Sequence, residues 1–280
     1  MFEVIRTTEK HCEKHHIDYT ETVTVFCGRE VPTLCPTCQE ELMEKQRIEE
    51  QQRQHQQFLE NQKQSKINRL KRLTNSSEVP PRYLTRTFDN YKAATDQQVR
   101  VLSIMKEYGA NFGKYQNTGA GIILAGRPGT GKTHLACALA NQLIHEYELL
   151  PVFTTASKMI RRIRETYSRE SKFTEQQVID IYASADLLII DEVGVQRGTE
   201  SEEHLLFEVI NDRNSGFKPT ILISNLNAAD IKSFIGERTM DRLREGGGKF
   251  IAFEWDSYRG SVANDSDLPT ANGLHVQQAS

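Results

Sequence analysis

Apolar runs and amphipathic stretches alternate along the chain after residue 120. Continuous or nearly continuous apolar runs predict buried strands at 122–125, 149–155, 186–192, 219–225 and 249–255. Between them, apolar residues recur at helical spacing and predict helices that start near 132 and 156, end near 182, and span 201–214, 228–235 and 238–245. Strands that alternate with helices are typical of a parallel sheet covered on both faces. The pattern therefore predicts an α/β fold.

The segment before this region has a different composition. Residues 39–73 combine glutamines and charged residues with scattered apolar positions, and contain neither Pro nor Gly. They show no sustained apolar heptad, so we expect a solvated, partly helical linker and not a stable coiled coil. The linker breaks at Asn75-Ser-Ser, Pro80-Pro81 enforces extended backbone, and a further helix is predicted over 96–109. The polar sequence after residue 262 predicts a disordered tail.

A glycine-rich motif follows the first predicted strand of the sheet. The chain reads Gly126-x-x-x-x-Gly131-Lys132-Thr133, the pattern of a phosphate-binding loop between a strand and a helix. Its glycines let backbone N–H groups approach phosphate oxygens, and the helix N-terminus adds partial positive charge. Lys132 is expected to reach the β- and γ-phosphates and the Thr133 hydroxyl to bind Mg²⁺. The residues expected to line the nucleotide here are Gly126, Arg127, Pro128, Gly129, Thr130, Gly131, Lys132, Thr133 and His134.

Polar side chains end two later strands. Asp191 and Glu192 end the run 186–192, where Asp191 is expected to hold Mg²⁺ through its water shell and Glu192 to polarise the attacking water. Asn225 ends the run 219–225, where its amide is expected to orient that water or contact the γ-phosphate. The alternatives are a strand that ends in two solvated acids and an ordinary turn asparagine.

Two groups of basic residues are candidates for phosphate contacts. Arg238, Arg242 and Arg244 lie on a short predicted helix, from which an arginine can stabilise transition-state charge in a neighbouring subunit. Ion pairs within that helix, through Asp241 or Glu245, are the alternative. A second group surrounds the predicted apolar face Ile160, Ile163 and Tyr167, and is expected to contact single-stranded DNA: Lys158, Arg161, Arg162, Arg164 and Arg169. A merely solvated face is the alternative there.

Four of the five cysteines lie in the first forty residues, among them the pairs Cys12-x-x-His15 and Cys35-x-x-Cys38. Two such pairs match a zinc ribbon, in which two tight turns close a tetrahedron around the metal. So short a segment has too little apolar content to fold unaided, which also favours Zn²⁺. His16 is an alternative to His15, Cys27 is an alternative to either histidine, and a reduced, metal-free segment is the remaining alternative.

The overall composition narrows the choice of compartment and partner. The formal net charge of −3 over 280 residues gives no global attraction to nucleic acid, so any DNA site is a local patch. No apolar run reaches membrane-spanning length and the N-terminus has no apolar signal core. We therefore expect a soluble, cytoplasmic protein that does not contact a membrane.

From about residue 80 to 262 the chain resembles the AAA+ ATPase domain of bacterial and phage helicase loaders, the DnaC/DnaI group. The resemblance rests on five motifs besides the acidic pair: Pro-Pro-Arg-Tyr with Thr-Phe-Asp-Asn-Tyr, Gly-Thr-Gly-Lys-Thr-His-Leu-Ala, Ile-Ser-Asn, Gly-Glu-Arg-Thr-Met-Asp-Arg-Leu-Arg and Trp-Asp-Ser-Tyr-Arg. It implies that Asn225 is sensor 1, that Arg242 is the arginine finger with Arg238 beside it, and that Arg259 is sensor 2. Family members bind ATP, assemble side by side, hold single-stranded DNA and place the replicative hexameric helicase on DNA, which their N-terminal portion contacts. The zinc-type N-terminus here resembles that of some loaders.

The sequence thus predicts a zinc-ribbon-like module at 1–38, a polar helical linker at 39–78, an AAA+ ATPase domain at 79–262 and a disordered tail at 263–280. The predicted function is that of an ATP-dependent replicative helicase loader. One alternative is a transposition helper ATPase of the IstB type, which shares this domain and binds duplex DNA. Another is a non-catalytic adaptor that uses its ATP domain only as a binding surface.

Overall fold

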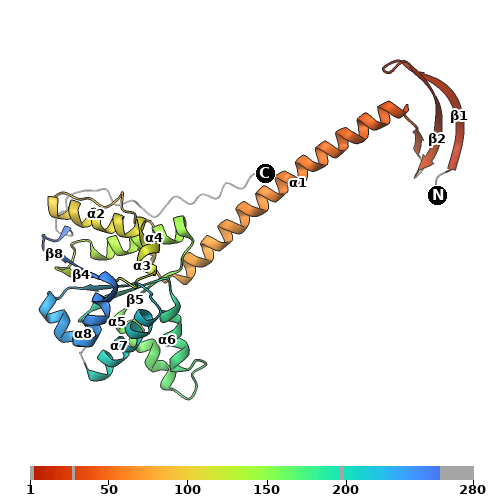
Figure 1. The fold of residues 1–280 in the computed structure, drawn as a ribbon. Coiled ribbons are helices and arrows are strands. Elements are labelled where there is room, and N and C mark those ends of the chain that lie inside the picture. The colour runs from red at the N-terminus through yellow and green to blue at the C-terminus, as the bar shows by residue number, and fades with distance from the viewer. Residues whose placement is uncertain (1–2, 27–28, 196–198, 259–280) are drawn as a thin grey trace. The chain divides into compact units, whose positions relative to one another are not determined.

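The computed structural model of the protein describes residues 3–26, 29–195 and 199–258 (Figure 1). The chain forms two compact units, Met1–Asn68 and Arg69–Ser280. Arg259, Cys27 and the predicted tail lie outside the described residues.

The first unit is an antiparallel sheet followed by the start of a long helix. Strands β1 (Glu3–Cys12) and β2 (Ile17–Phe26) form a hairpin, and β3 (Arg29–Pro32) pairs with the far edge of β2. Helix α1 (Pro36–Ser76) then runs for 41 residues without a buried side chain. Most side chains of α1 are exposed, which fits the polar composition of this segment.

The second unit is built on a parallel sheet of five strands among the described residues. Its strand order is β5-β6-β7-β4-β8. The strands are β4 (Ile122–Gly126), β5 (Pro151–Thr155), β6 (Leu187–Val193), β7 (Thr220–Ser224) and β8 (Lys249–Phe253). The helices are α2 (Asp96–Ala110), α3 (Phe112–Gln116), α4 (Lys132–Tyr147), α5 (Ala156–Arg164), α6 (Glu175–Ser184), α7 (Glu200–Ser215) and α8 (Ala228–Arg244), with 3₁₀ turns at Pro81–Tyr83, Glu165–Tyr167 and Glu245–Gly247.

Side chains alternate between the two faces of this sheet, as strand geometry requires. Ile122 and Leu124 of β4 pack with α2, α3 and α4, whereas Ile123 and Ala125 face the core formed with α5, α6, α7 and α8. Figure 1 shows the two layers of helices on opposite sides of the sheet. The predicted α/β class, a parallel sheet flanked by helices, is therefore confirmed.

Two local features refine the predicted elements. Helix α8 bends at Gly236 (φ 78°, ψ 158°), so it consists of two short helices, as expected for 228–235 and 238–245. Tyr167, predicted on the apolar face with Ile160 and Ile163, is instead 60% exposed. That prediction was wrong because the α-helix ends at Arg164 and a 3₁₀ turn rotates Tyr167 out of the buried face.

Arg213 of α7 is fully buried beneath the edge of the sheet where β6 and β7 begin. Its guanidinium donates to the hydroxyl of Thr220 and to four backbone carbonyls, those of Tyr182, Ala183, Ala185 and Pro219. The first three of these carbonyls lie at the C-terminal end of α6, where a cation complements the helix dipole. Arg213 thus ties α6 and α7 to the sheet.

No helix within the described residues is long and apolar enough to cross a bilayer.

Candidate functional site

The glycine motif forms a tight loop between β4 and α4. Gly126, Gly129 and Gly131 have φ values of 134°, 79° and 95°, in the region that favours glycine. A Cβ added to Gly126 would clash with the carbonyl oxygen of Phe253, and one added to Gly131 would lie 2.6 Å from a ring carbon of Tyr91. Both glycines are therefore required by conformation and by close packing.

Lys132 holds its ammonium group within this loop. Its Nζ donates to the carbonyl oxygens of Gly126 at 2.6 Å and Arg127 at 2.7 Å, and the residue is only 4% exposed. A buried ammonium at the N-terminus of α4 makes the loop electropositive, because the helix dipole adds to its charge. The loop therefore fits a polyphosphate.

Thr133 and Asp191 meet beside the loop. The Thr133 hydroxyl donates to Oδ2 of Asp191 at 2.8 Å, and Oδ1 of Asp191 accepts from the backbone N–H of Glu192 at 2.7 Å. Burial raises the pKa of the Asp191 carboxyl, and the two hydrogen bonds oppose this shift. A hydroxyl and a carboxylate in contact are the hard oxygen donors that Mg²⁺ takes, so these residues fit the metal of a magnesium nucleotide.

Glu192 and Asn225 follow at the ends of neighbouring strands. Glu192 has a positive φ of 59° at an irregularity in the β6–β7 pairing, and its side chain is exposed. Asn225 is exposed and directly follows β7, the strand between β4 and β6. The Ser224 hydroxyl donates to the Val193 carbonyl at 2.6 Å and joins these two strand ends. Parallel pairing thus brings the loop, the acidic pair and Asn225 to one edge of the sheet.

Residues that the sequence predictions gave no role surround the loop. The Trp255 indole N–H donates to the carbonyl of Thr130 at 3.0 Å, and the Tyr91 hydroxyl donates to the same oxygen at 3.4 Å. The ring of Tyr91 also packs edge-on against His134, with ring centroids 5.4 Å apart. Burial raises the pKa of Tyr91 to about 12 and lowers that of His134. No sequence motif indicates that Trp255 and Tyr91 contact the loop, because both contacts depend on tertiary proximity.

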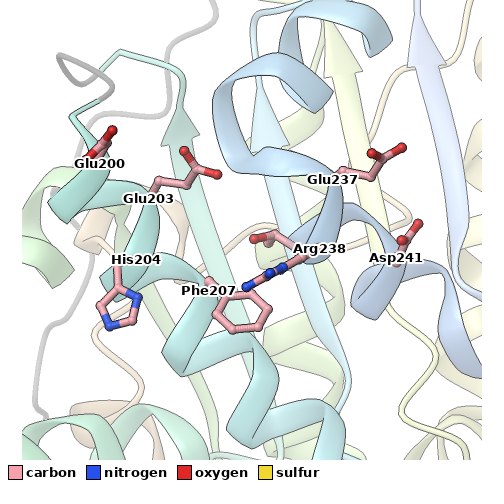
Figure 2. A pocket seen from close by; sticks show the side chains of 8 residues that line it. Glu200, Glu203, His204, Phe207, Glu237, Arg238 and Asp241 are labelled. Carbon is pink, nitrogen blue, oxygen red and sulfur yellow. The ribbon is translucent and has the colours of Figure 1, made fainter.

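The predicted arginine fingers lie on α8, which packs against α7. Arg242 donates to Oδ1 of Asn211 at 3.1 Å and to Glu245, just after the helix, at 2.7 Å, so it forms the local ion pair with Glu245 that was considered as the alternative. Arg238 is exposed and lines a cavity of about 670 Å³, together with Phe207 and the carboxylates of Glu200, Glu203, Glu237 and Asp241 (Figure 2). Within the described residues, the recorded partners of Arg242 lie on α7 and just after α8, not on the phosphate loop.

The predicted DNA-binding residues fall into two groups. Three are ion-paired: Glu78 bridges Lys158 at 2.6 Å and Arg162 at 2.9 Å, and Arg164 lies 3.5 Å from Glu202. The other two, Arg161 and Arg169, are exposed.

The predicted zinc ligands form a cluster in the first unit. Nδ1 of His15 lies 3.6 Å from the sulfur of Cys12 and 3.4 Å from the sulfurs of both Cys35 and Cys38. The sulfurs of Cys12 and Cys38 are 3.8 Å apart. In a tetrahedral zinc site, with bonds of about 2.3 Å to sulfur and about 2.0 Å to nitrogen, neighbouring ligand atoms lie about 3.5–3.8 Å apart. The four residues therefore fit Zn²⁺, and theirs is the one such cluster within the described part of the chain.

The second ring nitrogen of His15 has its own partner. Its Nε2 lies 3.2 Å from Oε1 of Glu41, which also pairs with Lys14. The neighbouring thiols, of which Cys35 has the largest effect, together with Glu41 raise the pKa of His15 to about 9. The alternative ligand His16 is not a member of the cluster.

Comparison with known proteins identifies a matching family and several relatives of this chain. The profile of a family described as IstB-like ATP binding protein matches residues 39–259. The replicative helicase loader DnaC of Buchnera aphidicola subsp. Schizaphis graminum is 36% identical over 203 residues, which cover 72% of this chain and 81% of the relative. The replicative helicase loader DnaC of Escherichia coli K12 is 33% identical over 200 residues, covering 71% of this chain and 80% of the relative.

Solved structures share the fold at lower identity. The crystal structure of the DnaC helicase loader superposes with a TM-score of 0.56 at 22% identity, covering 62% of this chain and 99% of that chain. AMPPCP-bound DnaA from Aquifex aeolicus gives a TM-score of 0.52 at 24% identity, with 64% of this chain and 52% of that chain covered. These similarities confirm the predicted AAA+ fold.

Proposed function

Because the chain belongs to the family of IstB-like ATP-binding proteins, together with the DnaC helicase loaders, we propose that it is an ATP-dependent loader of a replicative hexameric helicase. The observation that carries the proposal is the contact between Thr133 and Asp191 beside a buried Lys132. In this proposal the contact joins the two halves of a magnesium nucleotide site, in a chain whose relatives include replicative helicase loaders.

In this proposal, the loop from Gly126 to His134 binds the phosphates of ATP. Lys132 neutralises the β- and γ-phosphates, while Thr133 and Asp191 hold Mg²⁺. The ion, when bound, neutralises charge on the phosphate oxygens. Glu192 accepts a proton from the attacking water and Asn225 orients that water, so the site hydrolyses ATP.

Arginines complete the site between subunits. Arg242, with Arg238 beside it, acts on the nucleotide of a neighbouring copy, which is supported by their location on α8 and by contacts that lead away from their own loop. Arg259 is proposed as sensor 2. The protein therefore assembles side by side, and its nucleotide state controls that assembly.

Single-stranded DNA is the proposed ligand of the basic residues on and after α5. Arg161 and Arg169 are exposed for phosphate contact, and Lys158, Arg162 and Arg164 add charge when they exchange their carboxylate partners for phosphates. Such contacts do not depend on base sequence, as a loader requires.

Zinc is the proposed structural metal of the N-terminal module, residues 1–38. Cys12 ends β1 and His15 lies in the β1–β2 turn, whereas Cys35 directly precedes α1 and Cys38 lies in its first turn, so the metal would join the hairpin to the helix. We propose that this module binds the helicase, that residues 39–78 act as a linker, and that residues 79–262 form the ATPase domain.

A binding experiment tests the proposal. The cognate replicative helicase is incubated with full-length protein and with a variant lacking residues 1–74, each with and without ATP. We expect ATP-dependent capture by the full-length protein and loss of capture by the truncated variant. Full-length protein that captures no helicase under either condition would contradict the proposal.

The family description also supports a second candidate, an IstB-type helper of transposition. This candidate predicts co-purification with a transposase and preference for duplex over single-stranded DNA. A non-catalytic adaptor predicts instead that Glu192→Gln protein loads helicase as well as the wild type does.

A further inference from the structure

Two segments distant in sequence converge on one carbonyl group of the phosphate loop. The indole N–H of Trp255 and the hydroxyl of Tyr91 both donate to the carbonyl of Thr130, at 3.0 Å and 3.4 Å. Beside it, the backbone N–H of Tyr258 donates to the carbonyl of Gly129 at 3.0 Å. Tyr91 precedes α2, whereas Trp255 and Tyr258 follow β8. The loop is therefore contacted by one segment that precedes it in the sequence and by one that follows it.

The direction of a carbonyl fixes the direction of the next N–H. In a planar trans peptide, the C=O and N–H of one bond point to opposite sides. Because the Thr130 carbonyl points toward the Trp255 indole, the Gly131 N–H points away from it. By the same argument, the Tyr258 contact at Gly129 directs the Thr130 N–H. Consecutive N–H groups in a loop that opens a helix are the groups that bind phosphate.

The loop needs such external restraint. Gly129 and Gly131, on either side of Thr130, have positive φ values, and glycine has a wide choice of conformations. Thr130 itself is only 2% exposed, so water does not readily replace a lost donor to its carbonyl. Trp255 and Tyr91 therefore select one orientation of the peptide between Thr130 and Gly131.

We propose that Trp255 is a positioning residue for nucleotide binding: it holds the Thr130 carbonyl and thereby aims the Gly131 N–H at the triphosphate, with Tyr91 as the second donor. This proposal rests on the proposed ATP site and adds a residue to it. Nucleotide binding and the segment after β8 are coupled through this contact. Trp255 is also the only tryptophan of the chain, so its fluorescence reports on the loop.

The test compares full-length Trp255→Phe, Tyr91→Phe and the double variant by calorimetric titration with ATP and with AMP, in the presence of Mg²⁺. Each single variant retains an aromatic ring but loses one donor, and we expect about fivefold weaker ATP binding, the value of one hydrogen bond. The double variant leaves the buried carbonyl without either donor, so its loss should exceed the product of the single losses. Affinity for AMP, which lacks the β- and γ-phosphates, should change less than twofold.

Glu254→Gln is the matched control, because Glu254 lies on the same segment, next to Trp255, and its side chain is exposed. It should bind ATP within twofold of the wild type. Folded Trp255→Phe protein with wild-type ATP affinity would overturn the proposal, as would an equal loss for ATP and AMP. Wild-type protein that binds no ATP would overturn the proposed function as well.

A second measurement needs no substitution at Trp255. ATP should shift the emission of Trp255 in the wild type and leave it unchanged in Lys132→Ala protein. If ATP binds to the wild type, as calorimetry would show, without changing the emission, the coupling is absent and the proposal fails.

Discussion

The hydroxyl of Thr133 donates a 2.8 Å hydrogen bond to the carboxylate of Asp191, although the two residues are 58 positions apart in sequence. Thr133 lies in the first turn of α4, which follows β4 and the phosphate loop. Asp191 lies near the end of β6, which is separated from β4 in the sheet by β7. The parallel sheet brings both to one edge, where each offers an oxygen to Mg²⁺. The proposed ATP site depends on this contact.

Asp191→Asn should uncouple Mg²⁺ from nucleotide binding. The amide has the shape of the carboxylate but lacks its charge, so we expect ATP affinity in Mg²⁺ to fall about tenfold or more, with little change in EDTA. Calorimetric titration under both conditions measures the difference. Asp180→Asn, an exposed substitution on α6, is the control. Equal affinity of wild type and Asp191→Asn in Mg²⁺ would exclude the assigned role.

The same substitution should stabilise the protein when nucleotide and metal are absent. Burial raises the pKa of Asp191 in the folded state, so the folded protein binds the proton more tightly than the unfolded chain does. The contribution of this carboxyl to stability is therefore fully present below its unfolded pKa and is lost as pH rises through the folded pKa. At neutral pH we expect Asp191→Asn to melt at a higher temperature than wild type, and a lower melting temperature would contradict this.

Gly126→Ala should disrupt the loop. The residue has φ 134°, and a Cβ there would clash with the backbone of Phe253, which allows little adjustment. We expect a loss of about 1–3 kcal/mol in the free energy of unfolding, together with loss of ATP binding. Gly113→Ala is the matched control, because Gly113 lies in α3 with open space around it. That change should be neutral or stabilising by about 0.5–1 kcal/mol. Urea unfolding of the two variants gives both values.

The local elements of the fold can be predicted from the sequence, whereas contacts between distant residues cannot. The phosphate loop and the buried strands are predictable because both are local: a strand, a glycine turn and a helix N-terminus lie within one short stretch. The contacts of Glu78 with Lys158 and Arg162 were not predictable, because the residues are 80 and 84 positions apart and pair only after α5 docks. Trp255 at Thr130 is a similar case, at a separation of 125 positions. A motif identifies residue types, but only tertiary structure shows which charges are already paired.

Glu78→Gln should strengthen binding to single-stranded DNA. The carboxylate of Glu78 now pairs with Lys158 and Arg162, and its removal frees both cations for phosphates. Affinity for a fluorescent oligonucleotide should rise, with a steeper dependence on salt concentration. Glu165→Gln is the control, because Glu165 is exposed next to α5 and its removal has only the general electrostatic effect. Equal gains for the two variants would show that Glu78 does not mask the basic residues.

Glu41→Ala should weaken zinc binding, because Glu41 accepts from the ring nitrogen of His15 that faces away from the thiols. Such a partner fixes the ring orientation and tautomer of a metal-binding histidine, and its loss typically costs 10–100-fold in affinity. Competition with a chromophoric chelator measures the change. Glu44→Ala, which removes an exposed pair with Arg47 further along the same helix, should leave zinc affinity unchanged. Unchanged affinity in both variants would exclude the role of Glu41, and absence of metal from the wild type would exclude the zinc site.

Titration of full-length protein with Mg²⁺-ATP, in the wild type and in Lys132→Ala, tests whether the glycine loop binds ATP. Lys132 is the buried cation of the loop, so its removal should abolish measurable binding while the fold is retained. We expect saturable binding by the wild type and none by the variant. Folded wild-type protein that does not bind ATP, or a variant that binds it equally well, would contradict the proposed ATP site.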